Sequence, residues 1–527
     1  MRHLLLILAA VLGSARAASR PNIVFAFADD YGRHASAYAA VDADPGVNAV
    51  ISTPHIDSIA KAGVLFRSAH VSSPSCTPCR SSLLSGRHFW QTGRGAILTG
   101  AVWDPALPSF PLLLREGGYH IGKTYKVWSP GTPVDAPFDR QRHAYEAAGG
   151  DFNNFSQRVS RLTAGGLPLP EAKARLLGTV RENFRAFLRA RPGDAPFFYW
   201  FGPTNTHREW AKGSGKALWK LDPDELKGKM PAFLPDVPAI REDLADYLGE
   251  VLAFDAAVGV LIEELKASGE WKNTILVISG DHGAPGFPRG KCTLYDFGTA
   301  VSLIAAGPGI PAGRVVDDFV SLPDLAPTFL ELAGREAPPE MSARSLVPVL
   351  RSAASGQVDP ARDHVLTGRE RHVDEARAGR LPYPQRAIRT REHRYIINFE
   401  PDRSPPGDLH PPGRPGKPPT RHQLLHESRA AYPDMDAGPT KAWLHEHRDD
   451  PRWKAAWELA FGLRPAEELY LLRDDPQQMK NLAGDPAHAA LKKELRDRLI
   501  ARLKATGDSR VTDESPVSER PPFAGPE

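Results

Sequence analysis

Residues 22–30 read Asn22-Ile23-Val24-Phe25-Ala26-Phe27-Ala28-Asp29-Asp30, a short apolar run that ends in two adjacent carboxylates. A second run, Thr274 to Ser279, ends in Gly280-Asp281-His282-Gly283, and Phe197 to Phe201 leads to Thr206-His207-Arg208. Continuous apolar runs of this length are typical of strands buried on both faces of a parallel sheet. Polar side chains therefore gather at the carboxyl ends of the strands, where open α/β sheets bind their ligands.

Helical spacing alternates with these strands. Apolar residues are spaced as in helices over residues 248–266 and 322–332. A further strand is predicted over Val301 to Ala306, and Gly307-Pro308-Gly309 follows it. Alternating strands and helices predict a doubly wound α/β sheet. The 527 residues, of which 41% are hydrophobic, are ample for a large core.

The sequence pattern that predicts secondary structure changes near residue 376. Arg386 to Asn398 predicts a hairpin, and Ala489 to Lys504 predicts an amphipathic helix, while the segment 403–421, rich in Pro and Gly, predicts a long surface loop. We therefore expect a catalytic domain over residues 18–375, a smaller α+β subdomain with a short antiparallel sheet over 376–508, and a disordered tail over 509–527.

The first 17 residues have the pattern of a secretory signal peptide. Arg2 and His3 give a basic start, Leu4 to Leu12 is apolar, and Ala15-Arg16-Ala17 fits a cleavage site. The apolar run is far shorter than the ~20 residues that span a bilayer, so a membrane anchor is disfavoured, and no later stretch predicts a stable membrane span. We expect an exported protein, periplasmic or secreted, or lysosomal in a eukaryotic host.

Overall charge does not point to a polyanionic partner. The formal net charge is +3, and the Lys and Arg residues are scattered along the chain. This disfavours nucleic acid as a partner, so any specificity for an anion must be local. The three cysteines are an odd number for an exported protein, which suggests that one is free or chemically committed.

Residues 76–87 combine a nucleophile, a helix start and a fixed cation: Cys76-Thr77-Pro78-Cys79-Arg80-Ser81-Ser82-Leu83-Leu84-Ser85-Gly86-Arg87. A Cys-x-x-Cys pair can also be a redox motif or half of a zinc site, but neither a thioredoxin-like context nor two further ligands at close spacing is visible. Pro78 suits the first position of a helix. A group placed there lies at the positive end of the helix dipole, which stabilises a developing negative charge.

This segment resembles the signature of the type I sulfatases, Cys-x-Pro-x-Arg followed by a Leu-Ser/Thr-Gly-Arg run. The resemblance implies that Cys76 is oxidised to formylglycine by a formylglycine-generating enzyme. It also implies an alkaline-phosphatase-like fold, a doubly wound mixed sheet with a smaller C-terminal α+β subdomain. The similarity extends to Glu467-Glu468-Leu469-Tyr470, Asp475-Pro476 and Asn481-Leu482-Ala483, and so covers nearly the whole mature chain.

The resemblance also implies a metal site. Asp29, Asp30, Asp281 and His282, with one oxygen of the modified Cys76, would hold one Ca²⁺ ion. Carboxylate oxygens are the ligands that a hard divalent cation prefers, although preference for calcium over magnesium rests on the resemblance alone. An isolated Asp-Asp pair is commonly a solvated strand end, but its combination with the other two motifs favours the metal site.

Other catalytic roles follow from the same resemblance. Arg80 would fix and polarise the formylglycine, Lys291 would contact the sulfate, and His207 would protonate the leaving group, for which imidazole is apt near neutral pH. A second lysine is either Lys123 or Lys126, and counting from Gly118-Tyr119 favours Lys126. The family's histidine in this element is absent, and Tyr125, Trp128 and Ser129 lie nearby in the sequence instead.

We therefore expect a sulfatase that hydrolyses a sulfate ester or a sulfamate on a glycan. His207-Arg208 and Pro288-Arg289-Gly290-Lys291 are most similar to the heparan N-sulfatase (sulfamidase) branch. One alternative is a phosphodiesterase or phosphonate hydrolase of the same superfamily. Another is a non-catalytic binder of sulfated glycans, which only the absent histidine supports. A disulfide between Cys79 and Cys292 is left open.

Overall fold

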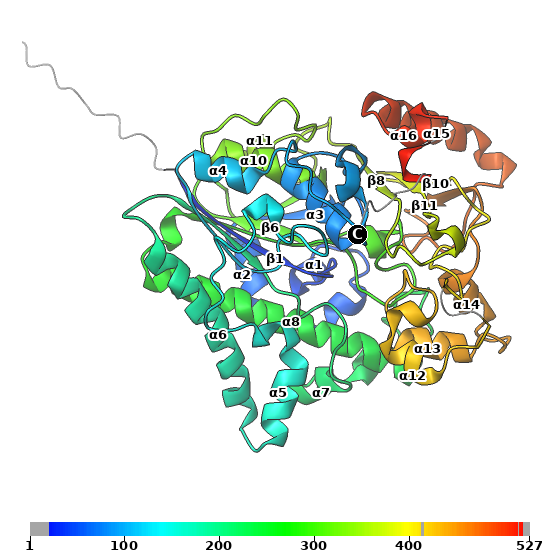
Figure 1. Ribbon diagram of the computed structural model, residues 1–527, viewed down its shortest axis with the longest axis horizontal. Coiled ribbons are helices and arrows are strands. Elements are labelled where there is room, and N and C mark those ends of the chain that lie inside the picture. The colour runs from blue at the N-terminus through cyan, green and yellow to red at the C-terminus, as the bar shows by residue number, and fades with distance from the viewer. Residues whose placement is uncertain (1–19, 413–415, 515, 520–527) are drawn as a thin grey trace, which may run out of the picture.

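The computed structural model describes residues 20–412, 416–514 and 516–519, so the expected signal peptide lies outside the described residues. Its centre is a sheet in the order β3-β4-β1-β5-β6-β2-β7 (Figure 1). The strands of this sheet are β1 (Asn22–Ala28), β2 (Val64–His70), β3 (His120–Tyr125), β4 (Phe197–Gly202), β5 (Thr274–Gly280), β6 (Leu303–Ala306) and β7 (Arg314–Ser321).

Strand β1 lies near the middle of the sheet and pairs in parallel with both β4 and β5. Ile23 is in register with Phe198 on one side and with Ile275 on the other. Strand β6 runs antiparallel to both of its neighbours, β5 and β2. The doubly wound mixed sheet that the sequence predicts is therefore confirmed, and the carboxyl ends of β1, β4 and β5 meet at one edge.

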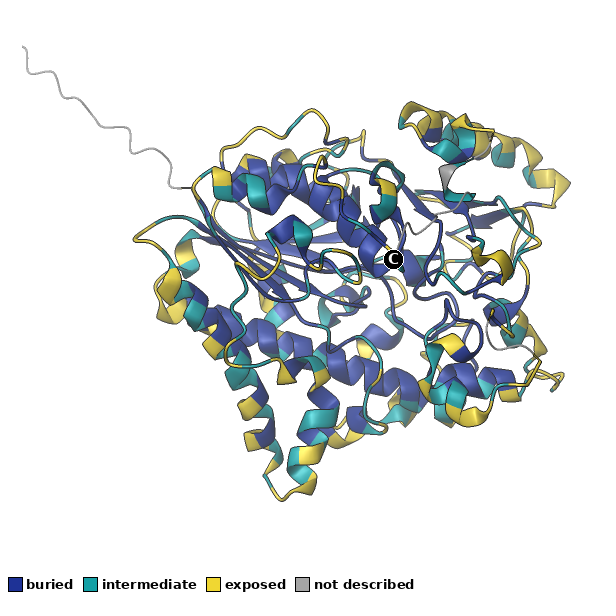
Figure 2. Cartoon of the chain, in the orientation of Figure 1, coloured by how far each residue is buried: buried dark blue, intermediate teal, exposed yellow. Residues whose placement is uncertain are grey.

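Successive residues of β1 point into two different cores, because side chains alternate along a strand. Val24 and Ala26 face one core, and Phe25 and Phe27 face the other, all with no exposed surface. Figure 2 shows the central strands buried throughout. A fully buried side chain such as Phe25 contributes about 1.5–3 kcal/mol, so the two-sided burial explains why continuous apolar runs mark these strands.

Helices cover both faces of the sheet (Figure 1). One face carries α3 (Cys76–Ser85), α4 (Phe110–Glu116), α10 (Leu325–Leu332) and α11 (Val347–Arg351). The other carries α2 (Pro54–Ala62), α5 (Phe155–Ala164), α6 (Leu169–Ala190) and α8 (Pro238–Ala267). The shorter helices are α1 (Ser36–Ala39), α7 (Ser214–Trp219) and α9 (Asp296–Thr299). No helix in the described part of the chain has the length and apolar character needed to cross a membrane.

The last third of the chain builds a second, antiparallel sheet in the order β11-β10-β9-β8. Its strands are β8 (His364–Arg369), β9 (Gln385–Thr390), β10 (His393–Asn398) and β11 (Glu467–Leu471), and its helices are α12 (Arg421–His426), α13 (Pro439–Glu446), α14 (Lys454–Phe461) and α15 (Ala489–Ala505). The predicted hairpin is the β9–β10 pair, and the predicted amphipathic helix is α15, whose Leu499 packs on Ile388 and Tyr395 in one small core. Strand β8 joins this sheet although it precedes residue 376, where we expect the subdomain to begin.

The tail that we expect to be disordered, 509–527, is folded in the part that the structure describes. Ser509–Thr512 forms the short helix α16, which Asp508 caps by accepting a hydrogen bond from the Arg510 backbone. The Arg510 side chain is buried, bonds both oxygens of Glu370 and lies 2.6 Å from Glu519. The prediction is wrong for these residues because their order depends on ion pairs with residues distant in the sequence.

Candidate active site

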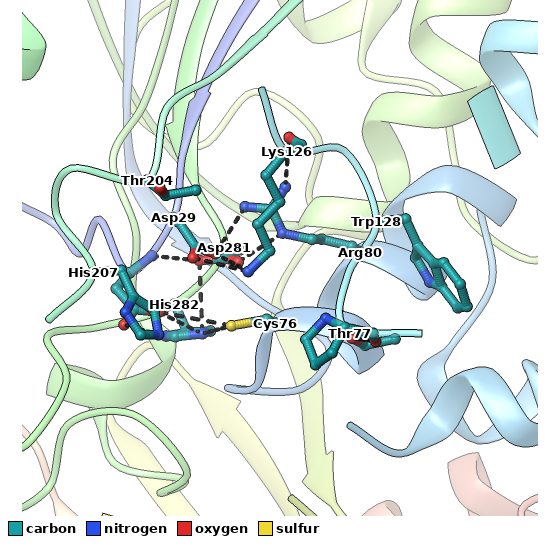
Figure 3. A network of polar contacts seen from close by, with 12 residues as sticks. Asp29, Cys76, Thr77, Arg80, Lys126, Trp128, Thr204, His207, Asp281 and His282 are labelled. Carbon is teal, nitrogen blue, oxygen red and sulfur yellow. Dashed lines mark hydrogen bonds and ion pairs between the residues drawn. The ribbon is translucent and has the colours of Figure 1, made fainter. Parts of the chain in front are cut away.

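The three motifs converge where helix α3 begins. Cys76 is its first residue, and it faces the acidic residues that follow β1 and β5. We expect Pro78 at the first helical position, but the helix starts two residues earlier, with Ser75 as N-cap. Pro78 still lies in the first turn, where the helix does not use its missing N–H. Figure 3 shows Cys76 and His282 on one side of the Asp29 and Asp281 carboxylates, with Arg80 and Lys126 on the other.

The candidate metal ligands form one buried cluster. Cys76 Sγ lies 3.4 Å from His282 Nε2 and 3.8 Å from Asp30 Oδ1, and His282 Nε2 lies 3.1 Å from Asp30 Oδ1. One ligand atom each from Asp29, Cys76 and Asp281 also falls within 4.8 Å of the others. Three carboxylates held together away from water need positive charge among them. The oxygen-rich donor set therefore fits a hard divalent cation.

Backbone geometry aims the carboxylates into this cluster. Asp30 has a φ of 55°, a left-handed conformation that Asp adopts more readily than most residues. Its N–H donates to Asp281 Oδ1 at 2.7 Å, and Tyr247 donates its hydroxyl to the Asp30 carbonyl at 3.0 Å. Thr206 donates to the carbonyl of Asp29. The turn after β1 is thus tied to β5, to α8 and to the segment after β4.

Three cations bracket the carboxylates. Arg80 is fully buried, and its guanidinium donates to Asp281 Oδ2 at 2.8 Å and to Asp29 Oδ1 at 3.1 Å. Lys126 Nζ lies 2.7 Å and 2.8 Å from the two oxygens of Asp29. Lys291 Nζ lies 3.0 Å from Asp30 Oδ2. Every predicted cation therefore contacts a predicted metal ligand.

These contacts set the protonation states. Burial alone would raise the pKa of Asp29, but the charges of Lys126 and Arg80 hold that pKa well below its usual value. For Asp281, burial dominates and raises the pKa above its usual value. Burial, together with the charge of Asp29, raises the pKa of the Cys76 thiol well above its ordinary value. The encoded thiol is therefore neutral at neutral pH, and thiolate chemistry is disfavoured.

The structure distinguishes the two candidate lysines. Lys123 Nζ points away from the cluster, bonding Asp135 Oδ2 at 2.7 Å and the Tyr125 carbonyl at 3.2 Å. Lys126 reaches the cluster, and it is the lysine that counting from Gly118-Tyr119 favours. The nearby Trp128 is buried and donates its indole N–H to Ser81 Oγ at 2.8 Å, so it offers no acid or base where the family has a histidine.

His207 lies at the rim of the cluster. Its Nε2 is 3.9 Å from Asp30 Oδ2, and its Nδ1 is 2.6 Å from the Arg208 carbonyl. If Nδ1 carries a proton toward that carbonyl, Nε2 is left to exchange a proton with a bound group. The side chain is 36% exposed, whereas those of Asp30 and His282 are fully buried. His207 is thus the predicted residue best placed to reach a substrate from outside.

Sequence reasoning did not identify Asp436, which the segment before α13 brings to the same site. Its Oδ2 lies 3.5 Å from Lys291 Nζ. Burial would raise the pKa of Asp436, but Lys291 and His207 hold it well below its usual value. Lys291 is therefore fixed between Asp30 and Asp436. The only local signal is an acidic pair, Asp434 and Asp436, within a turn bounded by Pro433 and Gly438.

The cysteines outside the cluster are not paired. Cys76, Cys79 and Cys292 are all free and buried. Cys79 packs in the core on the α3 face of the sheet, and the Cys292 carbonyl accepts a hydrogen bond from Arg369 at 2.6 Å. The disulfide that the sequence left open is absent from the structure.

The chain is similar to known proteins over most of its length. The family model described as Sulfatase matches residues 21–335. The human protein named N-sulphoglucosamine sulphohydrolase is 29% identical, in an alignment that covers 93% of this chain and 91% of that protein.

Two solved structures share the fold. One is described as a complex with its substrate D-glucosamine-2-N,6-O-disulfate; it has a TM-score of 0.61 at 18% identity and covers 94% of this chain and 100% of its own. The other is the phosphonate monoester hydrolase of Agrobacterium radiobacter, with a TM-score of 0.61 at 18% identity, covering 95% of this chain and 100% of its own. The alkaline-phosphatase-like fold predicted from the sequence is confirmed.

Proposed function

The chain belongs to the sulfatase family, and from that premise we propose that it removes sulfate from a glycan with a formylglycine made from Cys76 and a bound divalent cation. The observation that carries the proposal is the position of Cys76. Its Sγ lies within 4 Å of both Asp30 and His282, at the start of a helix and among three cations. A nucleophile at this place faces the positive end of α3.

We propose that Asp29, Asp30, Asp281 and His282 hold one Ca²⁺ ion, together with an oxygen of the modified Cys76. The support is the buried set of carboxylates and the raised pKa of Asp281, which burial causes and a cation would relieve. A bound divalent cation acts as a Lewis acid on sulfate oxygens and favours an ionised nucleophile. The chain's contribution is to fix the ligand oxygens through the backbone contacts of Asp29 and Asp30 described above.

Formylglycine supplies a hydrate with two hydroxyls, of which one can attack sulfur and the other allows sulfate to be expelled. A neutral, buried thiol would do neither, which favours oxidation of Cys76 by a formylglycine-generating enzyme during maturation. Arg80 orients the residue from one helical turn away, because its guanidinium is fixed by Asp29 and Asp281.

Lys126 and Lys291 would bind the sulfate oxygens from two sides. Burial would lower the pKa of Lys291, but Asp30 and Asp436 raise it well above its usual value, so the ammonium stays charged. His207 would give a proton from Nε2 to the leaving oxygen or nitrogen, as its place at the rim allows. The site then binds an anion with fixed charges and protonates the group that departs.

For the substrate we propose a sulfated amino sugar, with the chain in the sulfamidase-like branch. The human relative named above supports a sulfamate on glucosamine, and the structural neighbour in complex with a disulfated glucosamine supports the same sugar class. We also propose export under the control of residues 1–17, to the periplasm or outside the cell, or to the lysosome in a eukaryotic host. For the domains we propose a catalytic unit that ends before β8 and a smaller unit that begins with it.

A phosphonate hydrolase is the second candidate, because the phosphonate monoester hydrolase shares the fold. A phosphonate or phosphate ester would present a similar tetrahedral anion to Lys126 and Lys291. A non-catalytic binder is disfavoured by the complete set of candidate ligands around Cys76. Relative turnover of sulfated and phosphonate substrates distinguishes the two enzymes.

The test is release of inorganic sulfate from N-sulfoglucosamine and glucosamine 6-sulfate, beside hydrolysis of an aryl phosphonate monoester, by protein made in a host that forms formylglycine. We expect sulfate release to exceed phosphonate hydrolysis and to fall by about 10³-fold or more in Cys76→Ala. Lys227→Gln is the control, since that lysine is exposed and lies outside the cluster. Faster turnover of the phosphonate would overturn the proposal.

A further inference from the structure

A second cleft lies at the far end of α3. It has a volume of about 340 Å³ and shares no residue with the cluster around Cys76. Helix α3 has ten residues, so at 1.5 Å per residue its two ends are roughly 15 Å apart. The cleft is lined by the residues after α3, the end of β7, the segment 342–344, the start of β8 and the last turns of α15. A volume of this size is within the range of small-molecule sites.

The lining is strongly basic. It holds four arginines and two histidines but a single carboxylate: Arg87, Arg344, Arg362, Arg502, His88, His364 and Asp324. Asp324 is already committed, because Arg362 donates to its Oδ2 at 2.7 Å and the Arg344 backbone donates to its Oδ1 at 2.9 Å. Arg344 donates to the Ala361 carbonyl at 3.2 Å, and its nearest carboxylate is Asp359 at 3.7 Å, with an Arg344 side chain that is 53% exposed. The cleft therefore has excess positive charge.

Two of these arginines have no carboxylate partner within the described residues: Arg87 and Arg502. The Nε of Arg87 is buried and has no hydrogen-bond acceptor there. No carboxylate among the described residues neutralises this guanidinium, so an anionic ligand that reaches its terminal N–H groups would supply the missing counter-charge. The guanidinium fork matches two oxygens of a sulfate, a phosphate or a carboxylate. Arg87 thus marks the place where an anionic group would bind.

The other walls favour an organic anion over a bare ion. Phe319, Pro323 and Leu366 give apolar surface. The His88 ring, also in the lining, stacks on Trp90 with centroids 4.5 Å apart and planes 4° apart. Burial lowers the pKa of His88 to about 4, so this ring is neutral and acts as a flat surface. Flat rings beside cations and hydroxyls such as Thr506 are the surroundings that a sulfated sugar unit requires.

We infer that this cleft is a second binding site for a sulfated saccharide unit, separate from the site that removes sulfate. The inference rests on the proposed function for its choice of a sulfated sugar over another organic anion. Arg87, Arg344 and Arg502 hold the sulfate group, and the sugar ring lies against the apolar side. Binding a polyanionic chain at a second point keeps it on the enzyme between turnovers.

Direct binding tests this without relying on activity. Isothermal titration of the full-length Cys76→Ala protein would use a sulfated heparin hexasaccharide, its desulfated counterpart and inorganic sulfate. We expect Arg344→Gln/Arg502→Gln to weaken binding of the sulfated hexasaccharide by at least about tenfold, because two charge-assisted contacts are lost. Arg87→Lys, which keeps the charge but removes the planar guanidinium fork, should weaken it as well.

The matched control is Lys504→Gln/Arg351→Gln, which removes the same charge. Lys504 is two residues from Arg502 and so roughly 200° around α15, and neither control residue lines the cleft. Equal weakening in the control and the cleft variant would overturn the inference, as would unchanged binding in the cleft variant. Inorganic sulfate bound as tightly as the hexasaccharide would overturn the saccharide assignment. If turnover assays showed a phosphonate hydrolase, the proposed function would fail, but these titrations would still decide whether the cleft binds.

Discussion

Two buried ionic clusters in this protein contain similar residue types, but we expect only one of them to bind a further charge. The cluster around Cys76 places Asp29, Asp30 and Asp281 among Arg80, Lys126 and Lys291. The cluster under the second sheet joins Glu370 and Asp508 to Arg386 and Arg510. Both are buried, and both mix carboxylates with cations. Their residue types alone do not show which of them is a site.

The difference lies in which side chains face the carboxylates. In the second-sheet cluster, guanidinium N–H groups bond both oxygens of Glu370 and both of Asp508. In the Cys76 cluster, a thiol and an imidazole face Asp30 at 3.8 Å and 3.1 Å, and the pKa of Asp281 is raised by burial. A cluster whose carboxylates face only guanidinium groups stabilises the fold, whereas one that also holds a thiol and an imidazole beside a carboxyl of raised pKa is suited to bind a further charge.

The largest effect should come from Asp281→Asn. We expect sulfate release to fall by about 10³-fold or more, because a proposed metal ligand and a partner of Arg80 are changed together. Stability without divalent ions should remain within about 1 kcal/mol of the parent or rise, since an ionised carboxylate with a raised pKa destabilises the folded state. Thermal unfolding with and without Ca²⁺ measures this, and Ca²⁺ should raise the Tm of the parent only.

Glu370→Gln should show the reverse pattern. Removing one partner leaves Arg386 and Arg510 buried without their charge complement, which costs about 3–5 kcal/mol of unfolding free energy. Sulfate release per folded molecule should stay unchanged, because Glu370 is absent from the Cys76 cluster. Urea unfolding, paired with activity of the folded fraction, provides the measurement. A full loss of turnover in the folded fraction would remove the contrast between the clusters.

Lowering the pH should destabilise the second-sheet cluster by protonating Glu370. Burial would raise the pKa of Glu370, but Arg510 and Arg386 lower it from 4.5 to about 2. A carboxyl with a lowered folded-state pKa stabilises the fold above its unfolded value, and that stability is lost as the pH falls from about 4.5 toward 2. The loss should be about 3 kcal/mol at 1.36 kcal/mol per unit. In Glu370→Gln, the free energy of unfolding should therefore change by about 3 kcal/mol less over this pH range than in the parent.

The smallest effect should come from Asp436→Asn, which loosens Lys291 without removing it. We expect KM for the sulfated substrate to rise about tenfold with a smaller change in kcat, because one of the two carboxylates that position Lys291 is neutralised. Asp434→Asn is a poor control, as that residue bonds Arg369 and Arg377. Lys227→Gln, at an exposed lysine outside the cluster, is a better one. An unchanged KM would show that Asp30 alone positions Lys291.

The sequence predicted the parts of the molecule whose signals are local. Strand β1 and the two carboxylates after it lie in one stretch of nine residues, and burial on both faces of the sheet explains the continuous apolar run. Lys126, which counting from Gly118-Tyr119 favours, lies beside Asp29 because β3 and the turn after it are short. In each case the information lies within about ten residues of the element concerned.

The remaining features depend on contacts between distant segments. Asp436 approaches Lys291 only when the second unit packs on the first, and Arg510 is ordered by Glu370 across 140 positions of the sequence. Strand β8 joins the second sheet through its register with β9, which no pattern before residue 376 reveals. Pairings of this kind are set by tertiary packing, so a single sequence does not specify them.

Mass spectrometry of the tryptic peptide Ser68 to Arg80, from active protein made in its own host, would show whether Cys76 carries the proposed modification. We expect Cys76 to be present as an aldehyde, while Cys79 in the same peptide remains a thiol and provides an internal control. An aldehyde at Cys76 would identify the nucleophile at the start of α3. An unmodified Cys76 in protein that still releases sulfate would rule out a formylglycine nucleophile.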